Sequence, residues 1–117
     1  MYLSIANENI CYQKLGFGKE PSDHMFIAEH KNGFWQNMRI EPFHVILLSP
    51  FAKCLHYGQT VFEGLSAFRL QDNNISVFRP DKHHKRFNNS LKRMCMPEIP
   101  YSLFITALKE FVSLEKN

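Results

Sequence analysis

The sequence lacks a long hydrophobic run. None of its apolar stretches approaches the roughly 20 residues that a membrane-spanning helix requires. The opening residues, MYLSIANENICYQ, do not join a basic segment to an apolar one as a secretory signal peptide does. The three cysteines, Cys11, Cys54 and Cys95, are odd in number and include no CxxC pair, which argues for a reducing compartment. We therefore expect a soluble, cytoplasmic protein without a membrane partner.

The sequence also carries little net charge. Its 14 Lys and Arg residues exceed its 11 Asp and Glu residues by only 3, which does not argue for nucleic acid. Six of the basic residues lie in RPDKHHKRFNNSLKR (79–93), but at helical spacing they do not share one face. The adjacent His83 and His84 diverge by about a quarter turn of helix, whereas useful zinc pairs lie a full turn apart. The stretch therefore predicts a solvated helix face, with neither a nucleic-acid site nor a metal site.

The first half of the sequence predicts strands. Two β-prone runs, HMFIAEH and FWQNMRI, flank an Asn-Gly pair at 32–33, which is the strongest short signal for a hairpin. The turn cluster QDNN (71–74) predicts a second hairpin, over about 62–70 and 75–79. Between them, EPFHVILLSP (41–50) is an apolar run bounded by prolines, which indicates a buried strand or an extended segment.

The second half predicts two amphipathic helices. Pro80-Asp81 suits a first helical turn, and Pro97 and Pro100 end this helix. The apolar stripe of the helix consists of Phe87, Leu91, Met94 and Cys95. A second helix is expected from Ser102 to Glu115. Strands followed by helices predict an α+β fold, an antiparallel hairpin sheet with helices packed on one face. This domain would occupy residues 24–117, after an N-terminal arm formed by residues 1–23.

Two features of the sequence indicate a binding site. Arg86 directly precedes the core-facing Phe87 near the positive end of its helix, where a planar guanidinium can hold a phosphate or a carboxylate. In LHYGQTVFEG, Tyr57 and Phe62 flank a glycine-containing bend and could form the apolar wall of a ligand pocket. The alternative for Arg86 is a solvated helix face, and the alternative for the two aromatics is a buried turn.

At these residues the sequence resembles a known family. LHYGQTVFEGLSAFR, followed by VFRPDKHHKRFNNSLKRMCMPEIP, is similar to the N-terminal small domain of branched-chain amino acid aminotransferases. These enzymes belong to the fold-type IV class, which uses pyridoxal 5′-phosphate (PLP). FGKEPSDHM and RIEPF fit the same family in the same order, so the resemblance covers about residues 15–115.

The resemblance implies roles for four residues. Arg86 falls on the arginine that grips the cofactor phosphate in this family. Tyr57 and Phe62 fall on residues that line the pocket for the branched aliphatic side chain, and Phe17 falls on a residue that closes over it. The family also implies branched-chain amino acids and 2-oxo acids as substrates, and a homodimer.

The resemblance further implies that the catalytic lysine is missing. In this family the lysine that forms a Schiff base with PLP lies in a C-terminal domain, beyond residue 117, and none of the nine lysines of this chain occupies its position. We therefore expect the N-terminal domain of a longer enzyme, inactive by itself. The alternatives are a non-catalytic module that binds a phosphate ligand or dimerises, and a fragment of a D-amino acid aminotransferase or an aminodeoxychorismate lyase.

Overall fold

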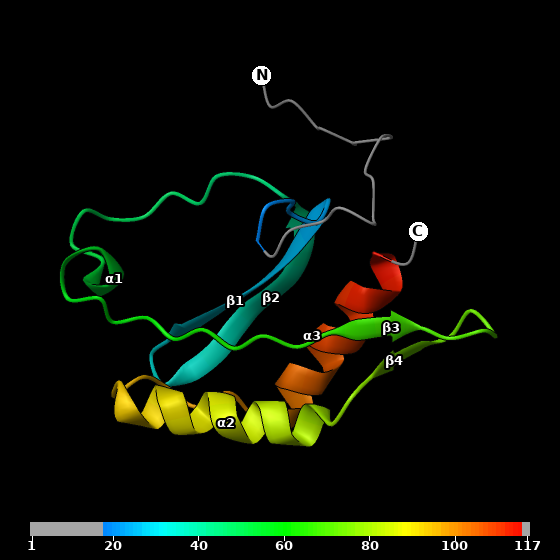
Figure 1. Ribbon diagram of the computed structural model, residues 1–117. Helices are drawn as coiled ribbons and strands as arrows, with labels where there is room; N and C mark the ends of the chain where they lie inside the picture. Colours follow the sequence, from blue (N-terminus) through cyan, green and yellow to red (C-terminus); the bar gives the residue numbers. More distant parts are fainter. Residues whose placement is uncertain (1–17, 116–117) are drawn as a thin grey trace. The chain divides into compact units, whose positions relative to one another are not determined.

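The described part of the chain, residues 18–115 of the computed structural model, forms four strands and three helices (Figure 1). The elements are β1 (His24–Lys31), β2 (Phe34–Pro42), α1 (Lys53–His56), β3 (Ala67–Arg69), β4 (Ile75–Val77), α2 (Pro80–Arg93) and α3 (Tyr101–Leu114). The strands pair as two separate antiparallel hairpins, and the predicted α+β fold is therefore confirmed. The chain divides into two compact units, one ending at Ile46 and the other beginning at Leu47.

The first unit is built on the hairpin that the Asn-Gly pair predicts. β1 and β2 pair over their whole lengths apart from one irregularity. Asn32 and Gly33, which connect the strands, have φ values of 55° and 85°. Positive φ at both positions is the mark of a type I′ turn, whose twist matches that of the flanking strands.

The irregularity in this hairpin is a β-bulge on β2. Ile27 lies opposite Arg39, whereas Glu29 lies opposite Gln36, so β2 has one residue more than β1 in this interval. Asn37 lies within the interval and has a φ of 54°. A bulge bends its strand and redirects the side chains around it. Here it brings Arg39 close to Glu29, two residues beyond Ile27, its cross-strand partner.

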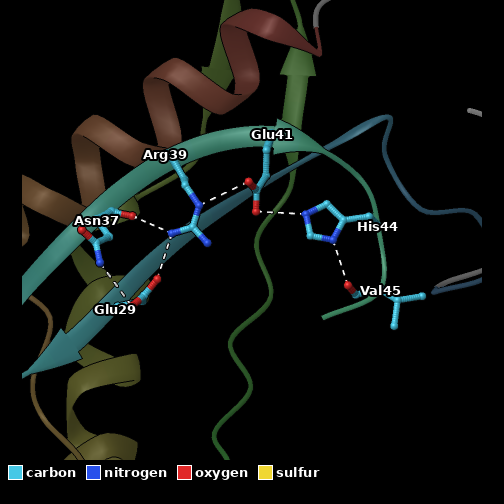
Figure 2. A network of polar contacts seen from close by, with 6 residues as sticks. All are labelled: Glu29, Asn37, Arg39, Glu41, His44 and Val45. Atoms are coloured by element: carbon cyan, nitrogen blue, oxygen red, sulfur yellow. Dashed lines mark hydrogen bonds and ion pairs between the residues drawn. The ribbon is translucent and has the colours of Figure 1, made fainter. Parts of the chain in front are cut away.

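Arg39 organises a polar network on the first unit (Figure 2). Its Nη1 donates to Glu29 Oε1 and to the Asn37 carbonyl, both at 3.0 Å, and its Nε donates to Glu41 Oε2 at 3.2 Å. The amide of Asn37 also donates to Glu29, and these bonds, first from Asn37 and then from Arg39, lower the pKa of Glu29. The side chains of Arg39 and Glu29 are 41% and 47% exposed, so water screens their attraction and the pair adds little stability.

His44 extends the same network beyond the end of β2. Its Nδ1 donates to the Val45 carbonyl at 2.8 Å, and its Nε2 lies 3.1 Å from Glu41 Oε1 (Figure 2). The second contact is an ion pair rather than a well-directed hydrogen bond. A neutral imidazole carries a single N–H, so acceptors at both ring nitrogens favour the charged ring. The Val45 carbonyl first, and then the Glu41 carboxylate, raise the pKa of His44, while burial and, less strongly, the charge of Arg39 oppose them.

The second unit contains the other hairpin, which is shorter than predicted. The sequence predicts strands over about 62–70 and 75–79, whereas β3 and β4 each contain three residues. The predicted turn between them is confirmed. The N–H of Leu70 donates to the Asn74 carbonyl at 2.8 Å, and Asp72 Oδ1 accepts from the N–H of Asn74 at 3.0 Å.

Of the two alternatives for the apolar run EPFHVILLSP, a buried strand or an extended segment, the buried strand is wrong. Residues 43–49 form no regular element, and Val45 and Leu47 are 73% and 95% exposed. Hydrophobicity alone does not show whether anything in the chain covers such a run. The short helix α1, which follows it, has no periodic signal in the sequence. The His56 ring at the end of α1 donates to the Pro50 carbonyl at 2.5 Å.

Both long helices are confirmed, each beginning within one residue of its predicted start. α2 begins at Pro80 as predicted, and α3 runs from Tyr101 to Leu114 where Ser102 to Glu115 was expected. Arg79, expected at the end of a strand, instead has a φ of 49° and precedes α2. This left-handed residue turns the chain from β4 into the helix.

The C-terminal end of α2 differs from the prediction. The N–H of Met96 donates to the Leu91 carbonyl at 2.9 Å, and the N–H of Cys95 donates to the Lys92 carbonyl at 3.1 Å. This pair of bonds is the Schellman motif, which ends a helix at a left-handed residue that is usually glycine. Cys95 takes that place with a φ of 52° and is exposed. Its expected position on the apolar stripe of the helix is therefore wrong, and the helix ends before Pro97.

A side-chain amide joins α2 to the segment that leads into α3. Asn88 Nδ2 donates to the Ile99 carbonyl, and the N–H of Ile99 donates to Asn88 Oδ1, both at 3.0 Å. His84 Nε2 donates to the same carbonyl at 2.7 Å, and its ring packs edge-on against Tyr101 at 5.1 Å. These bonds satisfy backbone groups that no helix or strand pairs. They hold the start of α3 against α2, which α3 crosses in Figure 1.

The apolar core of the second unit is small. Among the described residues, Leu91 is the only buried hydrophobic one, with 5% of its surface exposed. Phe87 and Met94, which share its stripe on α2, are half-buried. A cleft of about 360 Å³ separates β4 from α3 and is lined by Ile75, Val77, Pro80, Ile105, Leu108, Lys109, Val112 and Ser113. Hydrogen bonds and ion pairs therefore do much to set the path of the chain through the second unit.

Replacing Cys95 with glycine is expected to stabilise the chain. A non-glycine residue in the left-handed conformation costs roughly 1–2 kcal/mol, and the exposed Cys95 side chain offers little in return. In a urea titration, the free energy of unfolding should rise by about 1 kcal/mol. Cys95→Ala removes the thiol but keeps Cβ, and it should change little. Equal gains in both variants would contradict this explanation.

His44 is expected to titrate above its ordinary pKa of 6.5. Because folding raises this pKa, the stabilisation is fully present below pH 6.5 and is lost as the pH rises through the higher folded value. A pH titration followed by NMR of the imidazole carbon-bound protons measures the midpoint. Glu41→Gln should lower that midpoint, and Glu98→Gln, in the other unit, should leave it unchanged. A wild-type midpoint at or below 6.5 would show that Val45 and Glu41 do not raise the pKa of His44.

Candidate functional site

A carboxylate withdrawn from water joins the loop before β3 to helix α2. The side chain of Glu63 is 6% exposed, and both of its oxygens accept hydrogen bonds. Arg86 donates from Nε to Oε2 at 2.7 Å and from Nη2 to Oε1. His83 Nδ1 donates to Oε1 at 2.8 Å. A two-pronged pair between arginine and carboxylate is among the strongest and best directed polar contacts.

These contacts determine where the protons of the cluster lie. The bond from Arg86, and after it the bond from His83, lower the pKa of Glu63 from 4.5 to about 2, although burial opposes the shift. Glu63 in turn raises the pKa of Arg86. His83 must carry a proton on Nδ1, because that nitrogen faces a carboxylate oxygen. The 3.5 Å approach of Arg86 Nη2 to the same nitrogen therefore brings two donors together and is not a hydrogen bond.

The loop that carries Glu63 lies along α2 because it is anchored at two points. Gln59 Nε2 donates to the carbonyl of Met94, at the C-terminal end of the helix, at 2.8 Å. Glu63 reaches Arg86, in the first half of the helix. From Arg86 to Met94 the helix advances about 12 Å, and an extended chain covers about 13 Å from residue 59 to residue 63. The matching lengths allow an extended loop to make both bonds, running antiparallel to α2.

Arg86 remains open to solvent although Glu63 holds it. Its side chain is 65% exposed. Within the described chain, its hydrogen bonds to Glu63 use Nε and one proton of Nη2, so the Nη1 side faces outward. A guanidinium with one edge held and the other exposed can bind an oxyanion such as phosphate or carboxylate.

The predicted aromatic residues are not enclosed. Tyr57 and Phe62 are 83% and 75% exposed, so the alternative of a buried turn is wrong. Gly58, with a φ of 60°, provides the bend between them. A Cβ added at Gly64 would lie 3.4 Å from the Phe62 ring, which is van der Waals contact. Phe17 lies outside the described residues.

Sequence reasoning missed Glu63, the residue on which the cluster depends. Its one signal is that it is the only charged residue between Tyr57 and Phe68. A charge within such an apolar run must find a partner if the run becomes buried. Sequence patterns cannot say that this partner lies 23 residues away on a helix.

The neighbouring histidines have separate roles within the protein. His83 donates to Glu63, and His84 donates to the Ile99 carbonyl. The described residues include no group of three His, Cys, Asp or Glu side chains that could hold a metal ion. In the same part of the chain, no helix combines the length and the apolar character that crossing a membrane requires.

Comparison with known proteins identifies relatives of the chain. No protein-family model matches it. Branched-chain-amino-acid transaminase 1 of Bacillus subtilis is 43% identical over 104 residues, which are 88% of this chain and 29% of that protein. Branched-chain-amino-acid aminotransferase 2 of the same organism is 38% identical over 105 residues, 89% of this chain and 29% of the relative. The branched-chain-amino-acid aminotransferase of Mycobacterium tuberculosis is 41% identical over 102 residues, 86% of this chain and 28% of the relative.

The chain thus spans less than a third of the length of the curated relatives it matches. The matches cover almost nine tenths of the chain and include both the Glu63 loop and α2. Over almost nine tenths of its length the chain is similar to branched-chain-amino-acid aminotransferases, at 38–43% identity, as the N-terminal domain of such a protein would be.

Proposed function

We propose that this chain is part of an enzyme that transfers amino groups between the branched-chain amino acids and 2-oxoglutarate with PLP. The names of the relatives support this reaction. The observation that carries the proposal is Arg86, which is exposed at one edge and held at the other. It falls on the position of the arginine that grips the cofactor phosphate in the family.

The residues of the chain fit the phosphate of this cofactor. Arg86 offers planar N–H donors to phosphate oxygens, and the described contacts leave its outer edge accessible. When bound, PLP supplies the electron-withdrawing ring on which amino transfer depends. The contribution of this chain is to hold and orient the phosphate end.

We extend the proposal to the substrate pocket. Tyr57, Phe62 and Phe17 would form an apolar wall for the side chain of the amino acid. Because Tyr57 and Phe62 are exposed in the described chain, the pocket would close only when other parts of the enzyme cover them. An apolar pocket gains about 0.8 kcal/mol per buried methylene, so it would discriminate only modestly among Leu, Ile and Val.

The remaining chemistry would come from a C-terminal domain. We propose that this domain carries the Schiff-base lysine and that the whole enzyme is a cytoplasmic homodimer. We also propose that residues 1–23 form an N-terminal arm and that residues 24–117 form a single domain of this enzyme.

One observation favours a second candidate, a non-catalytic module that binds a phosphate-bearing ligand. Glu63, which holds the inner edge of Arg86, and His83, which holds Glu63, both belong to this chain, so Arg86 is positioned without another domain. A module of this kind would bind phosphate ligands without forming an adduct with any lysine. The names of the relatives do not support a D-amino acid aminotransferase or an aminodeoxychorismate lyase.

The purified 117-residue chain is expected to show no transaminase activity. In this proposal the Schiff-base lysine belongs to the C-terminal domain, so proton transfer at the substrate carbon would lack its base in the isolated chain. A coupled assay with leucine, 2-oxoglutarate and added PLP measures glutamate formation. Turnover above that of free PLP would overturn this expectation.

Arg86→Lys is expected to weaken phosphate binding. The lysine keeps the charge beside Glu63 but loses the planar fork, so the affinity for pyridoxine 5′-phosphate should fall roughly tenfold. This probe carries the phosphate but no aldehyde, so it cannot react with lysines. Isothermal titration calorimetry measures the binding. Lys92→Ala changes another exposed cation of α2 and is the control. Equal losses in both variants would indicate a general effect of positive charge.

A further inference from the structure

We infer that Glu63 is a positioning residue, which holds the inner edge of Arg86 so that its outer edge faces the phosphate of the cofactor. The inference rests on the proposed role of Arg86 and adds the group that prepares it. The two partners differ in their exposure to water. The carboxylate is 6% exposed, whereas the guanidinium that it holds is 65% exposed.

The two hydrogen bonds fix the plane of the guanidinium. Arg86 donates from Nε and Nη2, so the carboxylate of Glu63 lies on one defined edge of the group. A single bond would leave the guanidinium free to rotate about the donor, but two parallel bonds do not. The Nη1 side is therefore directed away from Glu63.

His83 fixes the carboxylate in turn. It donates to Oε1, the oxygen that also accepts from Arg86 Nη2. Glu63 thus meets donors from two successive turns of α2, and its side chain cannot follow Arg86 outward. The chain of contacts runs from His83 through Glu63 to Arg86, and all three lie within the second unit.

This arrangement lowers the conformational cost of binding. A solvated arginine side chain samples many rotamers, and a ligand that immobilises it pays for that lost freedom in affinity. The two bonds to Glu63 restrict the rotamers of Arg86 before any ligand arrives. The charge of Glu63 works in the opposite direction, because a carboxylate beside the guanidinium weakens its attraction for an anion.

These opposing effects make the inference testable. If Glu63 acts only through its charge, Glu63→Gln should strengthen phosphate binding, because it removes a negative charge. If Glu63 positions Arg86, the same variant should weaken binding, because the neutral amide holds the guanidinium less firmly. Glu63→Asp keeps the charge but withdraws the carboxylate by one methylene, and positioning predicts that it also weakens binding.

The first measurement is the affinity of the full chain for pyridoxine 5′-phosphate, with pyridoxine as the ligand that lacks phosphate. Glu63→Gln and Glu63→Asp should each weaken binding of the phosphate form roughly 3- to 10-fold. Glu98→Gln is the matched control, because it removes an exposed carboxylate that pairs with another cation of α2, and it should have no such effect. In the Arg86→Lys background, Glu63→Gln should cause a smaller loss than it does alone.

The second measurement reports on the arginine itself. The Arg86 Nε–H signal in ¹H–¹⁵N spectra should be visible and protected from exchange in the ligand-free chain, and it should be lost in Glu63→Gln. Circular dichroism tests whether each variant is folded. If Glu63→Gln does not fold, Glu63→Asp is used for both measurements in its place.

The outcomes separate the two ideas. Unchanged or tighter phosphate binding in Glu63→Gln, or an Nε–H signal insensitive to Glu63, overturns the positioning role. A protected Nε–H signal in a chain that binds the phosphate form no better than pyridoxine overturns the proposed role of Arg86 and with it this inference.

Discussion

A single carboxylate joins the loop before β3 to the first half of α2 and sets the direction of Arg86. Glu63 is almost wholly removed from water, and a buried ion without a partner would cost the fold several kcal/mol. Arg86 and His83 satisfy it from the same face of the helix. Since the carboxylate and its donors belong to different elements, this requirement sets the direction of the arginine and, together with the bond from Gln59 to Met94, the place of the loop.

Other polar contacts set the path of the chain through the second unit. Leu91 is the only buried hydrophobic residue in the described range, so close apolar packing defines little of this path. The amide of Asn88 pairs with the backbone of Ile99 as a neighbouring strand would, and it directs the chain from α2 into α3. Left-handed residues at the two ends of α2, Arg79 and Cys95, provide the sharp changes of direction.

Local rules explain which parts of the fold could be predicted. The Asn-Gly pair at 32–33 and Pro80 each impose a backbone conformation through their own chemistry, so their elements appear where the sequence indicates. No such rule predicts the left-handed conformation of Cys95, because left-handed residues at helix ends are usually glycine. The alternative of a buried strand in the apolar run 41–50 was wrong for a different reason. Its composition shows that burial would be favourable but not whether any part of the chain covers it.

The candidate site divides in the same way. The sequence by itself determined the two hairpins, the two long helices, the turn of the first hairpin and, through the resemblance, Arg86 as the candidate for holding phosphate. Only the tertiary structure decided which edge of Arg86 is held and which is exposed, and that Tyr57 and Phe62 lie open. The physical reason is distance along the chain. Glu63 and Arg86 are separated by 23 residues, and their bond forms only after a loop and a helix have come together.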